Sequence, residues 1–94
     1  MKIEVEVKIY APFVRHTGEE TVDVILDQGA RIQDLVEYLI EQYPDLMHVL
    51  PGDGSGPERF MREVLLLKGE SIVQLHDELQ QGDRVHMLPA IVSG

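Results

Sequence analysis

Apolar and charged residues alternate without exception at the start of the chain, and this pattern dictates a sheet with one face in water. The apolar members are Ile3, Val5, Val7 and Ile9, and the charged members between them are Lys2, Glu4, Glu6 and Lys8. A period of two is typical of a strand with one buried and one exposed face. Pro12 ends the segment because proline cannot donate to a β-ladder. We therefore expect a half-buried strand over residues 2–9.

A second strand and one amphipathic helix follow. Residues 21–26 are rich in β-branched side chains and place Val22, Val24 and Leu26 on one face. An apolar stripe with helical spacing then runs through Ile32, Leu35, Val36, Leu39, Ile40 and Tyr43. Pro44 ends this helix, since the residue before a proline disfavours the helical conformation. A helix with one apolar stripe covers one face of one sheet, so the sequence predicts an α+β fold.

Three further strands are expected in the second half of the chain. They lie at residues 60–67, 70–73 and 84–88, after a loop rich in glycine and proline at residues 51–57. A length of 94 residues corresponds to one domain. We assign residues 1–88 to that domain and residues 89–94 to a flexible C-terminal tail of the same domain.

The composition excludes several classes of function. Lys and Arg number 8 against 17 Asp and Glu, and the resulting net charge of −9 disfavours binding to nucleic acid or to an anionic membrane. Cysteine is absent, which excludes disulfides, thiolate zinc sites and a cysteine nucleophile. No apolar run is long enough for a membrane span or a signal peptide, so we expect a cytoplasmic protein. The histidines at positions 16, 48, 76 and 86 lack metal-ligand spacing, and no serine lies in a nucleophile motif. We expect no metal site and no self-contained active site.

Strand alternation also predicts an apolar patch on the sheet face that points away from the helix. Its candidate members are Ile25, Leu65, Leu67, His86 and Leu88, together with Phe60 at the start of the third strand. Several apolar residues on an otherwise exposed face favour a partner-binding surface. A register shift of one residue would instead bury some of them in the core.

Four short motifs occur in order along the chain. They are Tyr10-Ala11-Pro12-Phe13-Val14-Arg15 with Gly18, a helix from Asp34-Leu35 to Tyr43-Pro44, the turn Gly82-Asp83, and a last strand ending in Leu88-Pro89 before Val92-Ser93-Gly94. Together they resemble the ThiS/MoaD family of ubiquitin-like sulfur carriers. Its members end in Gly-Gly, where this chain has Ser93-Gly94, and the loop at residues 52–57 fits MoaD-like members better than ThiS. The resemblance implies a β-grasp fold, with a mixed sheet of four to five strands and one main helix packed on one face.

In that family the carboxylate of the last glycine carries sulfur. The resemblance implies that a ubiquitin-activating-type adenylyltransferase adenylates Gly94 with ATP, used in trans, and that a thiocarboxylate then forms. This chain would bind no cofactor. The preceding residues would thread into the partner's active site: Pro89, Ala90, Ile91, Val92 and Ser93. The apolar patch would dock the activating enzyme and the large catalytic subunit of molybdopterin synthase. The chain would thus be a carrier and co-substrate rather than an enzyme.

Other functions stay open at this point. A ubiquitin-like modifier would undergo the same activation, with protein lysines as the acceptors of its C-terminus. A ThiS-like carrier would supply sulfur for thiazole synthesis. A plain interaction domain would have an inert tail.

Overall fold

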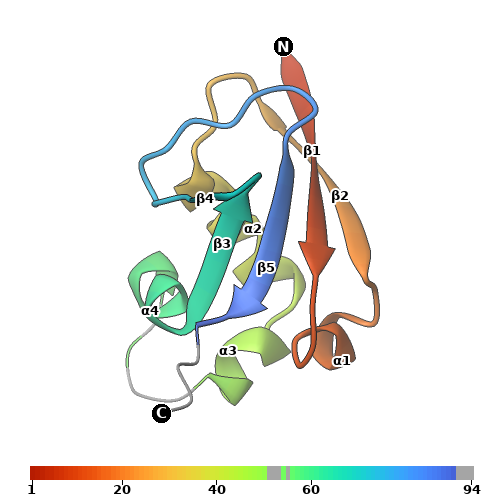
Figure 1. Cartoon of the computed structure of the whole chain (residues 1–94), viewed down its shortest axis with the longest axis vertical. Coiled ribbons are helices and arrows are strands. Elements are labelled where there is room, and N and C mark those ends of the chain that lie inside the picture. Colours follow the sequence, from red (N-terminus) through yellow and green to blue (C-terminus); the bar gives the residue numbers. More distant parts are fainter. Residues whose placement is uncertain (51–53, 55, 91–94) are drawn as a thin grey trace.

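Five strands form one mixed sheet in the part of the chain that the structure, a computed structural model, describes: residues 1–50, 54 and 56–90. They are β1 (Lys2–Ile9), β2 (Thr21–Asp27), β3 (Val64–Lys68), β4 (Ser71–Ile72) and β5 (Arg84–Pro89). Across the sheet their order is β2-β1-β5-β3-β4 (Figure 1). The β1–β5 pair is parallel, whereas β1–β2, β3–β5 and β3–β4 are antiparallel. A mixed sheet of five strands agrees with the prediction from the sequence.

The main helix, α2 (Ile32–Gln42), lies behind the sheet in the view of Figure 1 and covers one of its faces. Its buried residues are Ile32, Leu35, Val36 and Leu39, all members of the predicted stripe. At the start of the helix, the carboxylate of Asp34 accepts a hydrogen bond of 2.8 Å from the Arg31 N–H. At the other end, α2 stops two residues before Pro44, which confirms the predicted effect of that proline.

Three short helices complete the fold. They are α1 (Val14–Thr17), α3 (Asp45–Val49) and α4 (Gly56–Glu63). The sequence did not predict α4, because residues 60–63 were assigned to the third strand, which in fact begins at Val64. The helical signals are present nonetheless: Pro57 and Glu58 lie in the first turn and Arg62 in the last, where each residue type favours a helix. Among the described residues, no helix is long and apolar enough to cross a bilayer.

Phe60 belongs to the core and not to the exposed patch predicted for it. Its side chain has 0% relative exposure and lies in the hydrophobic core cluster. The prediction was wrong because Phe60 lies on the buried side of α4, where the alternation of a strand does not apply. The aromatic ring therefore stabilises the packing of α4 and is not available to a partner.

The two faces of the sheet are sharply different. The inner face, which α2 covers, contributes ten buried residues to the core: Ile3, Val5, Val7, Ile9, Val22, Val24, Val64, Leu66, Val85 and Met87. On the same strands, the alternate residues are partly or fully exposed. The alternation predicted from the sequence is thus confirmed for β1, β2, β3 and β5.

The turn Gly82-Asp83 fixes the start of β5 to β1. Gly82 has a φ of +83°, a backbone conformation that residues with a Cβ adopt only with strain. Its N–H donates to the carbonyl of Glu4 over 2.8 Å, and the Asp83 carbonyl accepts from the Glu6 N–H over 2.9 Å. The Asp83 carboxylate also pairs with the Lys68 ammonium at 3.3 Å. These contacts explain why glycine and aspartate stand together just before the last strand.

Replacing Phe60 by alanine is expected to lower the free energy of unfolding by about 3–5 kcal/mol, because it leaves a cavity under α4. That is a large part of the roughly 5–15 kcal/mol typical of a small domain. Urea denaturation measures the change, with Phe60→Leu as the milder control. If Phe60→Ala unfolds at the same urea concentration as the unchanged chain, the side chain is not in the core.

Two neighbours on β3 test the two faces directly. Leu66 is fully buried on the inner face, whereas Leu67 is half-buried on the outer face. Leu66→Ala should lower the free energy of unfolding by about 2–5 kcal/mol, and Leu67→Ala by about 1 kcal/mol. The same denaturation experiment compares them, and equal losses would contradict the assignment of faces.

Candidate functional site

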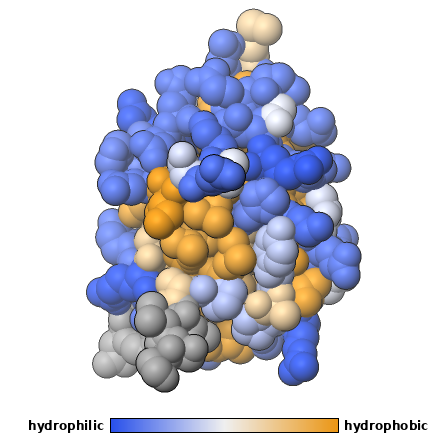
Figure 2. Space-filling view, in the orientation of Figure 1, coloured by the Kyte–Doolittle hydropathy of each residue, from blue (hydrophilic) through white to orange (hydrophobic). Residues whose placement is uncertain are grey.

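An apolar patch covers the part of the sheet formed by β3, β4 and β5, on the face away from α2 (Figure 2). Strand register places Leu65 opposite Leu88, and Leu67 opposite both His86 and Ile72. Ile72 is 65% exposed, and the other four side chains are half-buried. We call these five residues the outer patch. The structure thereby brings together four residues that strand alternation predicted.

Ile72 is the member of the outer patch that the sequence prediction missed. The signal was available in the turn between β3 and β4. Lys68 pairs with Ser71, which leaves Gly69 and Glu70 as a two-residue hairpin loop. A loop of that length fixes the register of the hairpin, and this register sets Ile72 beside Leu67.

Ile25 shares the outer face but lies apart from the outer patch. It is 62% exposed on β2, opposite Glu4 of β1. The strand order places β1 between β2 and β5, so a row of charged β1 side chains separates Ile25 from the apolar residues. The predicted exposure of Ile25 is confirmed, but its grouping with the patch is wrong.

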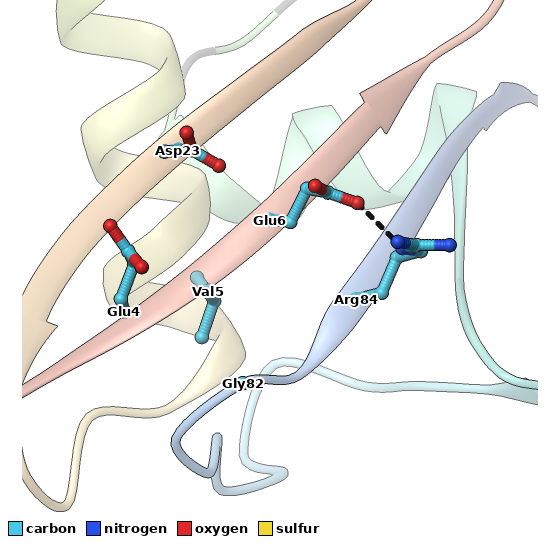
Figure 3. A pocket seen from close by; sticks show the side chains of 6 residues that line it. All are labelled: Glu4, Val5, Glu6, Asp23, Gly82 and Arg84. Atoms are coloured by element: carbon cyan, nitrogen blue, oxygen red, sulfur yellow. Dashed lines mark ion pairs between the residues drawn. The ribbon is translucent and has the colours of Figure 1, made fainter.

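Charged side chains occupy the other half of the outer face, over β1 and β2. A pocket there is lined by Glu4, Val5, Glu6, Asp23, Gly82 and Arg84 (Figure 3). The Arg84 guanidinium forms an ion pair with Glu6, drawn as the dashed line in Figure 3. The Lys2 ammonium hydrogen-bonds to Asp27 and lowers the pKa of that carboxyl group. Within residues 1–50, 54 and 56–90, no group of three or more His, Asp or Glu is placed to hold a metal ion.

His86, the polar member of the outer patch, is held by Tyr10. The Tyr10 hydroxyl lies 2.9 Å from His86 Nδ1, and the two ring centroids are 5.8 Å apart. The Tyr10 N–H donates to the carbonyl of Met87 over 3.1 Å, which continues the pairing of β1 with β5. The ammonium of Lys8 lies 5.7 Å from the centre of the Tyr10 ring, within the range of a cation–π interaction. Tyr10, the first residue of the first sequence motif, therefore holds the side chain of His86 on the last strand.

Strand β5 leads from the outer patch to the C-terminal segment. Pro89, which the sequence analysis placed in the tail, is the last residue of β5 and lies opposite Val64. The N–H of the exposed Ala90 donates to the Glu63 carbonyl over 3.1 Å. The remaining predicted tail residues lie outside the described part of the chain: Ile91, Val92, Ser93 and Gly94.

Several solved structures share the fold of this chain. A molybdopterin converting factor subunit 1 from Pyrococcus furiosus is 26% identical, with a TM-score of 0.76 over 95% of this chain and 99% of that chain. Small archaeal modifier protein 1 from Haloferax volcanii is 24% identical, with a TM-score of 0.77 over 97% of this chain and 99% of that chain. The Amycolatopsis orientalis BexX/CysO complex contains a chain that is 22% identical, with a TM-score of 0.66 over 96% of this chain and 99% of that chain. A search of curated protein sequences found no significant match.

The family comparison covers nearly the whole chain. Residues 7–94 match the ThiS family, a span that begins within β1 and includes every element described after it. The predicted β-grasp fold is confirmed by the solved structures and by the mixed sheet with one covering helix. The chain belongs to the ThiS family of ubiquitin-like sulfur carriers.

Proposed function

We propose that the chain carries sulfur on its C-terminal carboxylate, that of Gly94, as the small subunit of molybdopterin synthase in molybdenum cofactor biosynthesis. Membership of the ThiS family is the observation that carries this proposal. The similar Pyrococcus furiosus protein is named as a molybdopterin converting factor subunit, which favours the molybdopterin branch. In this function the chain is a co-substrate in the cytoplasm, and its partner enzymes supply the catalytic groups.

Two steps on a partner enzyme would prepare the Gly94 carboxylate. In the first, a carboxylate oxygen attacks the α-phosphorus of ATP, pyrophosphate leaves, and an acyl adenylate forms. In the second, a hydrosulfide equivalent attacks the carbonyl carbon, and a C–S bond replaces the C–O bond as AMP leaves. ATP binds to the activating enzyme, a ubiquitin-activating-type adenylyltransferase, so this chain needs no cofactor of its own. The absence of cysteine is compatible with this chemistry because the sulfur sits on the main chain.

The end of β5 supports the delivery of such a carboxylate. β5 pairs with β1 as far as Met87 and with β3 as far as Pro89, so the last residues before the tail are held on the β3 side. Beyond Ala90, the four residues to Gly94 would span about 13–14 Å when extended. In this proposal Ile91, Val92 and Ser93 enter the partner's active site, and Gly94, with no Cβ, passes its narrowest part.

We further propose that the outer patch docks the activating enzyme and then the large synthase subunit. Leu88 precedes Ala90 by two residues, so a partner seated on the outer patch lies next to the start of the tail. Burial of exposed apolar side chains on docking gains the free energy of removing them from water. Each partner must receive the same tail and must therefore dock near its start, so in this proposal one surface serves both.

A pair of aspartate substitutions tests the docking surface. Leu67→Asp places a charge in the outer patch and should weaken binding to the cognate activating enzyme by about tenfold or more. Ile25→Asp is the matched control, because Ile25 is apolar, exposed and on the same face but outside the patch. Isothermal titration calorimetry measures both affinities, and circular dichroism verifies the fold. Equal affinities for the two variants would refute docking through the outer patch.

Intact-mass spectrometry tests the carrier chemistry itself. The chain is incubated with the cognate activating enzyme, ATP and a sulfide donor, and the mass should rise by the difference between sulfur and oxygen. Fragmentation should place that change at Gly94. Gly94→Ala, or one residue added after Gly94, should abolish the transfer while the thermal unfolding midpoint stays unchanged. Persistent lack of both adenylate and thiocarboxylate would rule out the carrier function.

A ubiquitin-like modifier is the second candidate, because small archaeal modifier protein 1 shares the fold with a TM-score of 0.77. The activation step is common to both functions, so the acceptor distinguishes them. Recovery of the chain from cells in isopeptide linkage to protein lysines would favour the modifier. Transfer of sulfur to a pterin precursor would favour the synthase subunit, and transfer to a thiazole precursor would favour a ThiS-like carrier.

A further inference from the structure

We propose that His86 is the hydrogen-bond donor through which the outer patch selects partners that present a carboxylate. This inference rests on the proposed function, since it names the chemical group that a docking partner must offer. His86 is the polar residue of the outer patch, and Leu67 lies opposite it on β3. On its other side it faces Lys8 of β1, at the boundary between the apolar and charged halves of the face.

Tyr10 determines which nitrogen of His86 carries the proton. The Tyr10 hydroxyl is 2.9 Å from Nδ1. That distance admits a hydrogen bond in either direction. Because a phenol O–H is a stronger donor than an imidazole N–H, and an imidazole nitrogen is a stronger acceptor than a phenol oxygen, the favoured arrangement has Tyr10 donating to Nδ1. The imidazole proton then sits on Nε2, because the partner of one ring nitrogen fixes the state of the other.

The Nε2–H group of His86 is free to meet a partner. Within the described part of the chain, the one hydrogen bond of the His86 side chain is the bond at Nδ1. Among the described residues, Nε of Arg59 is the one side-chain polar atom that is both buried and without a hydrogen-bond partner. Nε2 of His86 has no partner but is not such a buried atom, so solvent reaches it. An apolar surface that presents one fixed N–H requires an acceptor at the matching point of its partner. A partner without that acceptor would leave the donor unpaired on docking.

The charge beside His86 makes a carboxylate the fitting acceptor. Lys8 lies opposite His86 in the β1–β5 register, and neighbouring strands are about 4.8 Å apart. Its ammonium is held over the Tyr10 ring, 5.7 Å from the ring centre. The next charged pair along these strands, Glu6 with Arg84, neutralises itself. Lys8 is therefore the cation that lies directly opposite His86, while the carboxylates of Glu4 and Asp23 lie farther along the charged half. A carboxylate gains both the hydrogen bond and the attraction to Lys8.

Nitrogen NMR of the free protein tests the first step without any partner. Spectra recorded above the titration range of imidazole should show His86 protonated at Nε2 and unprotonated at Nδ1. Tyr10→Phe should give a mixture of both tautomers. Protonation of Nδ1 in the unchanged protein would overturn the proposal.

Two substitutions of His86 then test the donor in the complex. In His86→Gln the side-chain amide reaches the position of Nε2, whereas in His86→Asn it ends near the position of Nδ1. His86→Asn should weaken binding to the cognate activating enzyme by about tenfold or more, the effect of losing a hydrogen bond to a charged group. His86→Gln should stay within about threefold of the unchanged chain, since it restores the donor. Equal binding by the two variants would overturn the role of Nε2.

The carboxylate is tested through the salt dependence of the same affinity. Lys8→Met keeps an apolar stem but removes the charge, so it should weaken binding and reduce its dependence on salt. Lys2→Met is the control, because Lys2 lies on the same strand and face at the far end of the charged half. If Lys8→Met and Lys2→Met behave alike, the partner group is not a carboxylate. If the unchanged chain itself binds no activating enzyme, the proposed function is wrong. If the unchanged chain binds and His86→Asn binds equally well, only the role of His86 is wrong.

Discussion

The parallel pairing of β1 with β5 is the interaction on which the rest of the structure depends. It joins the first strand to the last, and its inner face contributes two fully buried neighbours, Val7 and Val85. Pairing over such a long sequence separation carries an entropic cost of loop closure. The hydrogen bonds of Gly82 and Asp83 to β1 help to offset that cost and set the register. β5 then lies inside the sheet, paired with β1 as far as Met87 and with β3 as far as Pro89, where the tail begins.

The division of the outer face follows from the strands that form it. β1 carries lysine and glutamate at every outer position, and β2 is an edge strand with Asp23 and Asp27 on the same face. Charged side chains on an edge strand hinder pairing with another chain. At the opposite edge, β4 is only two residues long, which leaves little backbone to pair. The apolar surface of β3 and β5 is thus available to a partner, while the edges resist strand-to-strand association.

Much of this site followed from period-two alternation, and the failures have physical causes. Alternation places Leu65, Leu67 and Leu88 on the outer face, because a strand leaves no other choice once one face is buried. It failed at Phe60, where the helix-favouring residues from Pro57 to Arg62 outweigh the expectation of a strand. The contact of Tyr10 with His86 could not be predicted either. Alternation fixes the face of the sheet on which a residue lies, but it does not fix the register, that is, which residue of the neighbouring strand lies opposite. The register of β5 against β1 is set by the backbone hydrogen bonds of the Gly82-Asp83 turn.

Strand β5 carries part of the outer patch and also leads into the C-terminal tail. In the proposed function, the docking of a partner is therefore coupled to the delivery of the Gly94 carboxylate. His86 and Leu88 point to the outer face, and Ala90 follows them on the same backbone. In the proposed function, a partner that binds the outer patch therefore lies beside the residue from which the tail starts. Four residues beyond Ala90 reach about 13–14 Å when extended, so the proposed function requires a partner whose active site opens within that distance of Ala90. A donor at His86 that fixes the partner's position on the sheet would thereby also bring Gly94 to the reacting atoms.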